Sequence, residues 1–181
     1  NLFAGSNDVM MNANRIQCNM NSMGEQCVSP GNSSVVGGGY WPKGTPDQYI
    51  FNGGIQVGAI IAGNRANFAW SGDTVGAWFF NAIGNGHTQA LGNAYNSLVP
   101  ADLAEWPSAA YVNDPTLFNP ALLGRKTISQ QDSYARYWDG SVGLLTGRQH
   151  PMGIMVDQKA LMWNFPSGNQ DIMYVLMRFI N

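Results

Sequence analysis

Cys18 and Cys27 are the two cysteines of the 181-residue chain, and the chemistry open to them is a disulfide bond. They lie on either side of residues 21–24, which begin with Asn and end with Gly, as a four-residue turn prefers. If this turn joins two antiparallel strands, Cys18 faces Cys27 at a Cα separation of roughly 4.5–5.5 Å, within disulfide reach. The spacing therefore predicts a disulfide-linked hairpin formed in an oxidising compartment, with two unrelated thiols as the alternative.

The sequence contains few residues that could bind a metal ion together. The cysteine spacing is not CxxC and brings no His or Asp close by, and a chain whose histidines are His87 and His150 cannot build a His-rich centre. The sequences VNDP and SGNQD carry the Asp and Asn oxygens that calcium prefers, but without the spacing of an EF-hand. We therefore predict no metal site and no cofactor, and calcium stays open as an alternative.

Eleven Asp and Glu residues could supply a carboxylate pair for acid–base catalysis. Asp132, Asp139 and Asp157 lie nearest to predicted strands, so they are the candidates for glycoside hydrolysis, which needs two carboxyl groups roughly 5–10 Å apart. The alternative is that these residues belong to turns, as Asp139 before a glycine indicates. No nucleophile signature such as GxSxG is present. The sequence assigns no catalytic residue, and we expect that the chain is not an enzyme.

Aromatic pairs are the remaining residues with binding chemistry. Tyr40-Trp41 lies among glycines and prolines, and Tyr137-Trp138 ends a predicted strand. Such side chains stack on sugars or anchor protein interfaces, and the alternative is that they fill the core of a β-sandwich. We take Tyr40, Trp41, Tyr137 and Trp138 as candidate ligand or interface residues.

Composition limits the class of protein. Charged residues make up 11% and the net charge is −2, whereas cytosolic enzymes carry about 25% charged residues. A surface of Asn, Ser, Thr and Gly is typical of secreted and cell-surface β proteins, and the charge gives no basis for binding nucleic acid. Apolar runs are too short to form a transmembrane segment. The chain starts at Asn1 rather than Met, which we interpret as a removed signal peptide or a fragment.

The elements that must position these residues are predicted to be strands. Residues 8–20 and 25–28 form an opening hairpin, and residues 48–61 form a hairpin or bulged pair broken at Gly53-Gly54. Residues 64–80 form another pair that turns at 71–73. A long irregular insertion at about 81–131 has one helical turn that begins at Pro100.

The C-terminal third is predicted to be more regular. Residues 132–140 form a strand, and residues 150–166 and 169–181 form two long antiparallel strands joined by a turn at 166–169. The second of these strands is nearly continuous in apolar residues, which predicts burial on both faces. The absence of a βαβ rhythm and of a long amphipathic helix favours an all-β fold, an antiparallel β-sandwich in a single β-rich domain of residues 1–181.

Four stretches carry a resemblance: DVMMNANRIQCNMNSMG, GGGYWPKGTPDQYIFNGGIQVGAII, DSYARYWDG and HPMGIMVDQKALMWNFPSGNQDIMYVLMRFIN. Together they resemble the N-terminal region of large, mostly uncharacterised secreted bacterial proteins of the Bacteroidetes and Gemmatimonadetes type. Those proteins often carry fibronectin type III repeats and a C-terminal sorting domain. The resemblance implies export and β structure and transfers no active site, and the chain is then the N-terminal module of a longer protein or a shorter relative.

The leading functional hypothesis is a secreted or cell-surface structural or interaction module, a subunit of an extracellular layer, filament or envelope complex. Its partners would be other protein subunits or copies of itself, because an apolar terminal strand left on an edge invites pairing. The first alternative is a carbohydrate-binding module that uses exposed aromatics. The second alternative is a secreted, carboxylate-dependent glycoside hydrolase.

Overall fold

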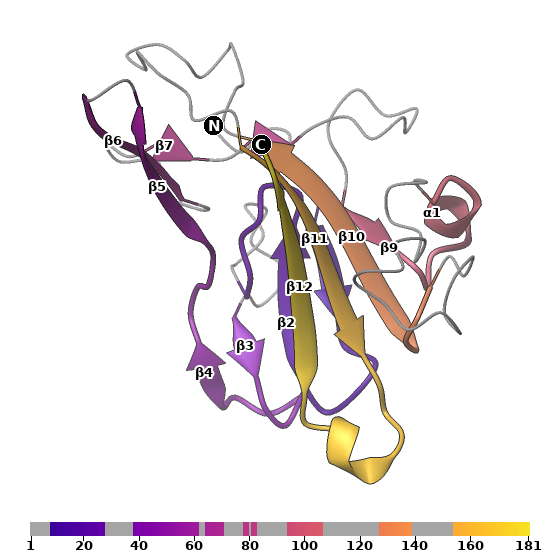
Figure 1. Ribbon diagram of the computed structural model, residues 1–181. Coiled ribbons are helices and arrows are strands. Elements are labelled where there is room, and N and C mark those ends of the chain that lie inside the picture. The colour runs from indigo at the N-terminus through magenta and orange to yellow at the C-terminus, as the bar shows by residue number, and fades with distance from the viewer. Residues whose placement is uncertain are drawn as a thin grey trace.

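The computed structural model describes residues 8–27, 38–61, 64–70, 78–79, 81–82, 94–106, 127–138 and 154–181. Strands dominate these ranges, and α1 (Pro100–Ala104) and a 3-10 turn, η4 (Ser167–Asn169), are the short helical elements within them. The all-β class is therefore confirmed (Figure 1).

The first sheet is antiparallel and has the order β1-β2-β3-β4. Its strands are β1 (Asp8–Met11), β2 (Gln17–Asn21), β3 (Gly39–Tyr40) and β4 (Gln48–Ile50). β1 and β2 form a hairpin that turns at residues 12–16, whereas the sequence predicted residues 8–20 as one strand paired with residues 25–28. Of that predicted pairing, the structure has a single bridge between Met20 and Gln26. β4 is the edge strand on the side away from β1. This sheet carries the disulfide and the aromatic segment that follows β3.

The Cys18–Cys27 disulfide is confirmed, with a Cα separation of 4.7 Å, but the two cysteines are not directly opposed. The amide of Cys27 donates to the carbonyl of Asn19, so the register is shifted by one residue from the prediction. Gly24 causes this shift, because its φ of 92° adds a left-handed residue after the turn. Cys27 itself has a φ of 56°, which turns its side chain back towards Cys18.

The second sheet is antiparallel and contains the longest strands, β10 (Gln131–Trp138), β11 (Met155–Met162) and β12 (Met173–Ile180). β8 (Asn81–Ala82) and β9 (Tyr95–Asn96) both pair with β10, so the order is β12-β11-β10-β8. β11 pairs with β12 over all eight residues, as predicted, and η4 forms the turn between them. Their length and the turn residues agree with the sequence.

β12 is not buried on both faces, which corrects the sequence prediction. It lies at the edge of the second sheet in the described part of the chain, and Tyr174 and Phe179 are 40% and 53% exposed. The central strand is β11, whose residues are mostly buried. A continuous apolar run marks a strand but does not say whether a neighbour covers it, and here one neighbour is missing among the described strands.

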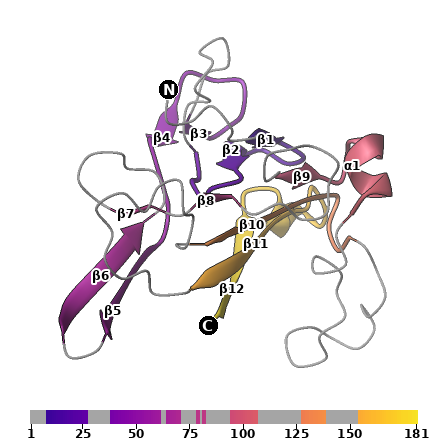
Figure 2. The same ribbon diagram turned by 90° about the horizontal axis from the view of Figure 1, so that it is seen from above.

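The core lies between the first and second sheets. One cluster joins Val9 and Met11 of β1 with Met20 and the disulfide on one side and Ala135 and Met162 on the other. At the tip of the β1–β2 sheet, Gly24 touches the ring of Tyr137, and a Cβ built there would lie 2.5 Å from its Cζ. Seen from above, β1 to β3 lie on one side of the sheet of β10, β11 and β12 (Figure 2).

The third sheet, β5-β6-β7, corrects two predicted pairings. Its strands are β5 (Gln56–Ile61), β6 (Asn64–Trp70) and β7 (Trp78–Phe79). The segment 48–61 is not a hairpin: β4 pairs with β3, β5 pairs with β6, and the Gly53 backbone exchanges hydrogen bonds with Gln26. In segment 64–80, β6 and β7 pair in parallel rather than as a hairpin. The predicted turn at 71–73 lies outside the described residues, and the sandwich arrangement of the whole chain stays a prediction.

Within the predicted insertion, residues 94–106 form α1 and β9, and β9 pairs with β10 on the side of that strand away from β11. α1 starts at Pro100, as predicted, because Pro lacks an amide that the first turn would leave unpaired. The carboxylate of Asp102 accepts a hydrogen bond from the Asn96 amide at 2.9 Å, which fixes α1 to β9. Trp106 packs against Tyr95 and Tyr134 of the second sheet.

Candidate functional site

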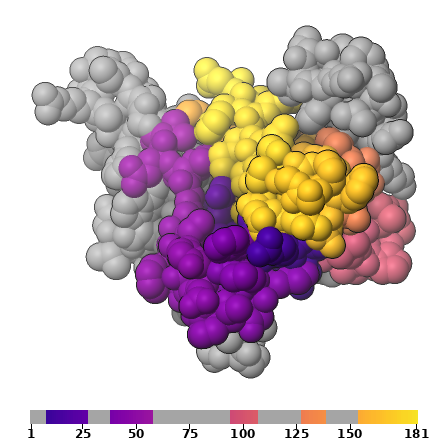
Figure 3. All heavy atoms as spheres, turned by 90° about the horizontal axis from the view of Figure 1, so that it is seen from below, coloured from indigo at the N-terminus to yellow at the C-terminus, as the bar shows by residue number. Residues whose placement is uncertain are grey.

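A cavity of about 380 Å³ opens between the edge strands of the two main sheets, β4 and β12. Its wall is largely apolar: Tyr40, Trp41, Tyr49 and Ile50 come from the first sheet and its loop, and Met173 comes from β12. The disulfide also lines it. On this side of the molecule the surface of residues 38–57 borders that of residues 154–181 (Figure 3). The volume lies in the lower part of the usual range for ligand pockets, roughly 300–1,000 Å³.

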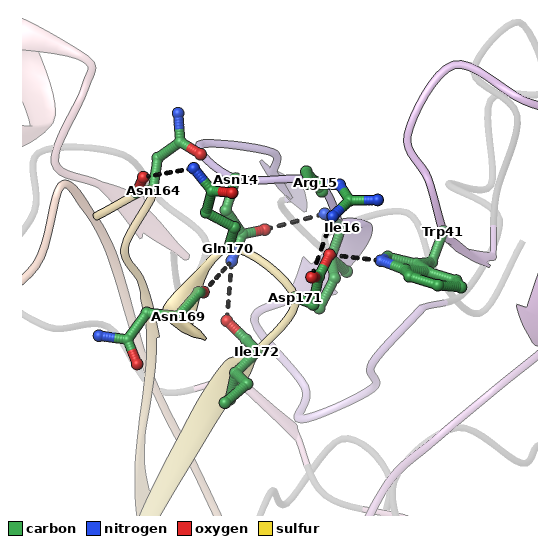
Figure 4. A network of polar contacts seen from close by, with 9 residues as sticks. All are labelled: Asn14, Arg15, Ile16, Trp41, Asn164, Asn169, Gln170, Asp171 and Ile172. Atoms are coloured by element: carbon green, nitrogen blue, oxygen red, sulfur yellow. Dashed lines mark hydrogen bonds and ion pairs between the residues drawn. The ribbon is translucent and has the colours of Figure 1, made fainter. Parts of the chain in front are cut away.

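Trp41 is the side chain at the mouth of the cavity, and its orientation is fixed by two charged neighbours. The indole Nε1 donates a hydrogen bond of 2.6 Å to Oδ1 of Asp171. Nη1 of Arg15 lies 3.1 Å from Oδ2 of the same carboxylate, and the guanidinium lies 5.6 Å from the centroid of the Trp41 ring. Figure 4 shows these three side chains together. Asp171 therefore carries a charge that is already matched by Arg15, so the mouth presents no unbalanced charge.

The network behind Trp41 joins two distant turns of the chain. The Arg15 amide donates to the carbonyl of Gln170 at 2.9 Å. Nδ2 of Asn14, a residue that is 1% exposed, donates to the carbonyls of Asn169 and Ile172 (Figure 4). These bonds attach the β1–β2 turn to the β11–β12 turn. Hydrogen bonds between these two turns therefore connect the parts of the chain that carry Trp41's partners, Arg15 and Asp171.

Gln131 makes a second connection between the sheets. Its Oε1 accepts from the amides of Asn12 and Ala13 at 2.7 and 2.9 Å, and its Nε2 donates to the carbonyl of Met10 at 2.8 Å. The side chain is 1% exposed. Neither Gln131 nor the Asn14, Arg15 and Asp171 network carries a signal in the sequence, because each partner lies more than a hundred residues away.

The four candidate aromatics divide into two pairs with different positions. Tyr40 is 8% exposed and lines the cavity, and Trp41 is 40% exposed at its mouth. Tyr137 is fully buried and donates to Oε1 of Gln158 at 3.0 Å, so it belongs to the core and is not an interface residue. Trp138 is 39% exposed and, as the next residue along β10, points to the opposite face. The structure brings Tyr40 and Trp41 together with Tyr49, which the sequence did not single out.

The rings of Trp41 and Tyr49 do not form a flat platform. Their planes meet at 63° with centroids 6.2 Å apart, an edge-to-face arrangement. Arg15 also occupies one face of the indole. A sugar-stacking site needs exposed coplanar rings, so this geometry fits an apolar side chain or strand better than a glycan.

The candidate carboxylates are engaged in structural contacts. Asp157 is 4% exposed and accepts from Nε and Nη2 of Arg136, at 2.5 and 2.9 Å, and from the hydroxyl of Tyr134 at 2.8 Å. Burial raises the pKa of Tyr134 well above its usual range, and the adjacent Asp157 carboxylate raises it further. Asp132 accepts from the amides of Ile128 and Ser129. Asp139, His87, His150 and VNDP lie outside the described residues.

A carboxyl pair that the sequence did not indicate lies at the end of the β1–β2 hairpin. Burial raises the pKa of Glu25, which a hydrogen bond from Asn21 lowers in part and the charge of Asp8 raises further. Burial also raises the pKa of Asp8, and Asn19 opposes that shift. Within the described ranges, no three or more His, Cys, Asp or Glu side chains gather in a way that would hold a metal ion. The pair is therefore a local source of pH sensitivity in the hairpin.

Comparison with protein families, curated proteins and solved structures found no match to this chain. The resemblance to secreted bacterial proteins thus stays a prediction. In the part of the chain that the structure describes, no helix has the length and apolar character needed to cross a membrane.

Proposed function

We propose that this protein is a secreted or cell-surface interaction module, a subunit of an extracellular assembly that makes its contact by strand addition at β12. The observation that carries the proposal is the edge itself. β12 pairs with β11 through eight consecutive residues without a shift in register, and it is the last strand of its sheet among the described residues.

Edge strands of soluble proteins are usually protected by a bulge, a proline, several charges or shortness, because their free amides and carbonyls recruit other strands. β12 has none of these protections along its length. Its sequence MYVLMRFI holds one charged residue, Arg178, and its side chains at Tyr174 and Phe179 are exposed. A strand with these properties is suited to main-chain pairing with another chain, and its apolar side chains add to the affinity.

Export to an oxidising compartment is supported by the disulfide and by the low charge content. A buried disulfide that closes a short hairpin forms and persists outside the cytosol in most organisms. An 11% share of charged residues fits a surface of Asn, Ser, Thr and Gly. Both features agree with the resemblance to secreted bacterial proteins.

The proposal is tested by sedimentation velocity of the full chain over a wide range of concentration. We expect wild-type protein to form concentration-dependent oligomers, and Leu176→Lys, which places a charge at the centre of β12, to stay monomeric. Leu98→Lys is the matched control, because Leu98 is 56% exposed and lies outside β12. Wild-type protein that is strictly monomeric at every concentration would contradict self-assembly, and equal effects of the two lysines would exclude β12 as the contact.

A further inference from the structure

The outer edge of β12, with which no other described strand pairs, and the cavity share one residue. Met173 is the first residue of β12 and also lines the cavity beside Trp41, Tyr49 and Ile50. A strand added to β12 would thus run along the mouth of the cavity. Whatever residue it places opposite Met173 would point at this apolar space.

The face of each β12 residue follows from its contacts. Met173 and Val175 pack against the core between the sheets, and Met177 packs against Tyr137 and Val156. Because side chains alternate along a strand, Phe179 points to the same face. It is nevertheless 53% exposed, although its face is the one that elsewhere packs on the core. Phe179 is therefore a large apolar group with the right direction for a core position and incomplete cover.

A second copy of the chain can supply the missing strand if two β12 strands pair antiparallel about a two-fold axis. In a continuous sheet, directly opposed residues point to the same face, so core-facing residues of one copy must lie opposite core-facing residues of the other. Neighbouring residues of a strand point to opposite faces, so the two-fold axis must pass through a residue and not between two residues. With the axis at Leu176, Tyr174 lies opposite Arg178 of the second copy, and Met173 lies opposite Phe179 of the second copy.

This register has an electrostatic advantage over the adjacent ones. It places each Arg178 opposite Tyr174 of the second copy, a pairing that favours a cation–π contact. An axis at Val175 would set Arg178 against Ile172, and an axis at Met177 would set it against Leu176. Directly opposed pairs have Cβ atoms roughly 4.5–5.5 Å apart, so only the axis at Leu176 brings a phenyl ring next to Met173.

We propose that two copies of this chain join through β12 about a two-fold axis at Leu176, and that Phe179 of each copy enters the cavity of the other. This inference rests on the proposed function and names its partner. The walls of the cavity are apolar and aromatic, and the Arg15–Asp171 ion pair at its mouth balances its own charge. A phenyl ring entering there meets no unpaired charge, and each copy both gives and receives one ring, as a two-fold contact requires.

The register is tested by cysteine cross-linking of the full chain, with the native disulfide in place. We expect Leu176→Cys to form a covalent dimer under mild oxidation, because residue 176 faces its own copy across the axis at a Cα separation within disulfide reach. Tyr174→Cys is the matched control: in this register its two copies lie about 13 Å apart along the strands, too far to bridge. Dimers formed equally by both variants, or by Tyr174→Cys alone, would overturn the register.

The cavity contact is tested by Phe179→Ala against Phe165→Ala. Phe165 is 76% exposed in the β11–β12 turn and lies outside the proposed contact. Two half-exposed rings become buried in each dimer, so we expect Phe179→Ala to weaken dimerisation roughly ten- to hundredfold. Phe165→Ala is expected to leave it unchanged. Near-UV circular dichroism of each variant checks that the monomer keeps its fold.

The outcomes separate the two proposals. Oligomers that are disrupted by Leu176→Lys but insensitive to Phe179→Ala would leave strand addition at β12 in place and refute the Phe179 contact. Wild-type protein that is monomeric at all concentrations would refute self-assembly through β12 and, with it, the Phe179 contact. A larger oligomer with no cross-link at residue 176 would refute the two-fold dimer and favour head-to-tail addition.

Discussion

Replacing Gln131 by Ala removes the side chain that connects the β1–β2 turn to the second sheet. In the structure its amide group accepts from the Asn12 and Ala13 amides and donates to the Met10 carbonyl, and all three bonds are 2.7–2.9 Å long. The side chain is 1% exposed, so its hydrogen bonds form away from solvent. We expect Gln131→Ala to lower the free energy of unfolding.

The size of the effect follows from the number of bonds lost. A typical intramolecular hydrogen bond contributes about 1 kcal/mol net, and a buried group left without a partner costs more, about 1–3 kcal/mol. Asn12 is exposed and Ala13 is half-buried, so water can replace the lost acceptor for these amides in part. These three bonds, with a longer fourth bond of 3.3 Å from Nε2 of Gln131 to Oδ1 of Asn96, predict a loss of about 3 kcal/mol. That is a large share of the roughly 5–15 kcal/mol that stabilises most domains.

Urea-induced unfolding followed by tryptophan fluorescence measures this loss. Gln130→Ala is the matched control, because Gln130 is the preceding residue, is exposed, and accepts one hydrogen bond from Asn164. We expect the control to change stability by less than about 1 kcal/mol. If the two variants differed by less than about 0.5 kcal/mol, the bonds of Gln131 would not be what holds the turn to the sheet.

Three further predictions address other parts of the structure. Reduction of Cys18–Cys27, which closes a loop with a sequence separation of nine, should lower the free energy of unfolding by about 2–3 kcal/mol, measured by urea titration with and without reductant. Burial raises the pKa of Glu25, so ionising this carboxyl group costs more in the folded protein than in the unfolded chain. The free energy of unfolding therefore falls as the pH rises from about 4.5. The free energy of unfolding of Glu25→Gln, relative to that of wild type, should therefore be higher at pH 7 than at pH 4. An equal difference between the two proteins at both pH values would contradict this. Asp157→Asn should cost about 3 kcal/mol by breaking a buried ion pair, whereas Asp171→Asn at an exposed pair should cost less than about 1 kcal/mol, both by thermal unfolding.

Local signals in the sequence were sufficient for the strands and turns that depend on adjacent residues. Alternation and turn residues predicted β10, β11, β12 and the turn at 166–169, and Pro100 predicted the start of α1. The turn at 21–24 predicted the disulfide. Its register was wrong by one residue, because the left-handed Gly24 and Cys27 add a step that a symmetric turn does not have.

Strand pairing was less predictable, because a partner can come from any part of the chain. Gly53 looked like the centre of a hairpin, yet its backbone bonds to Gln26, so β4 and β5 belong to different sheets. The apolar sequence of β12 looked like that of a buried strand, because an apolar run does not show whether a neighbouring strand covers it. The order of strands, and hence the position of the edge, is set by packing between sheets.

For the site, the sequence by itself determined the residue types: an aromatic segment at Tyr40-Trp41, a disulfide, and an apolar terminal strand. Only the tertiary structure decided that these features meet in one cavity. Arg15 and Asp171 are 156 residues apart along the chain, and their ion pair orients Trp41 at the cavity mouth. Such a contact has no sequence pattern, because it depends on how two turns dock, and docking is a property of the packed core rather than of either turn.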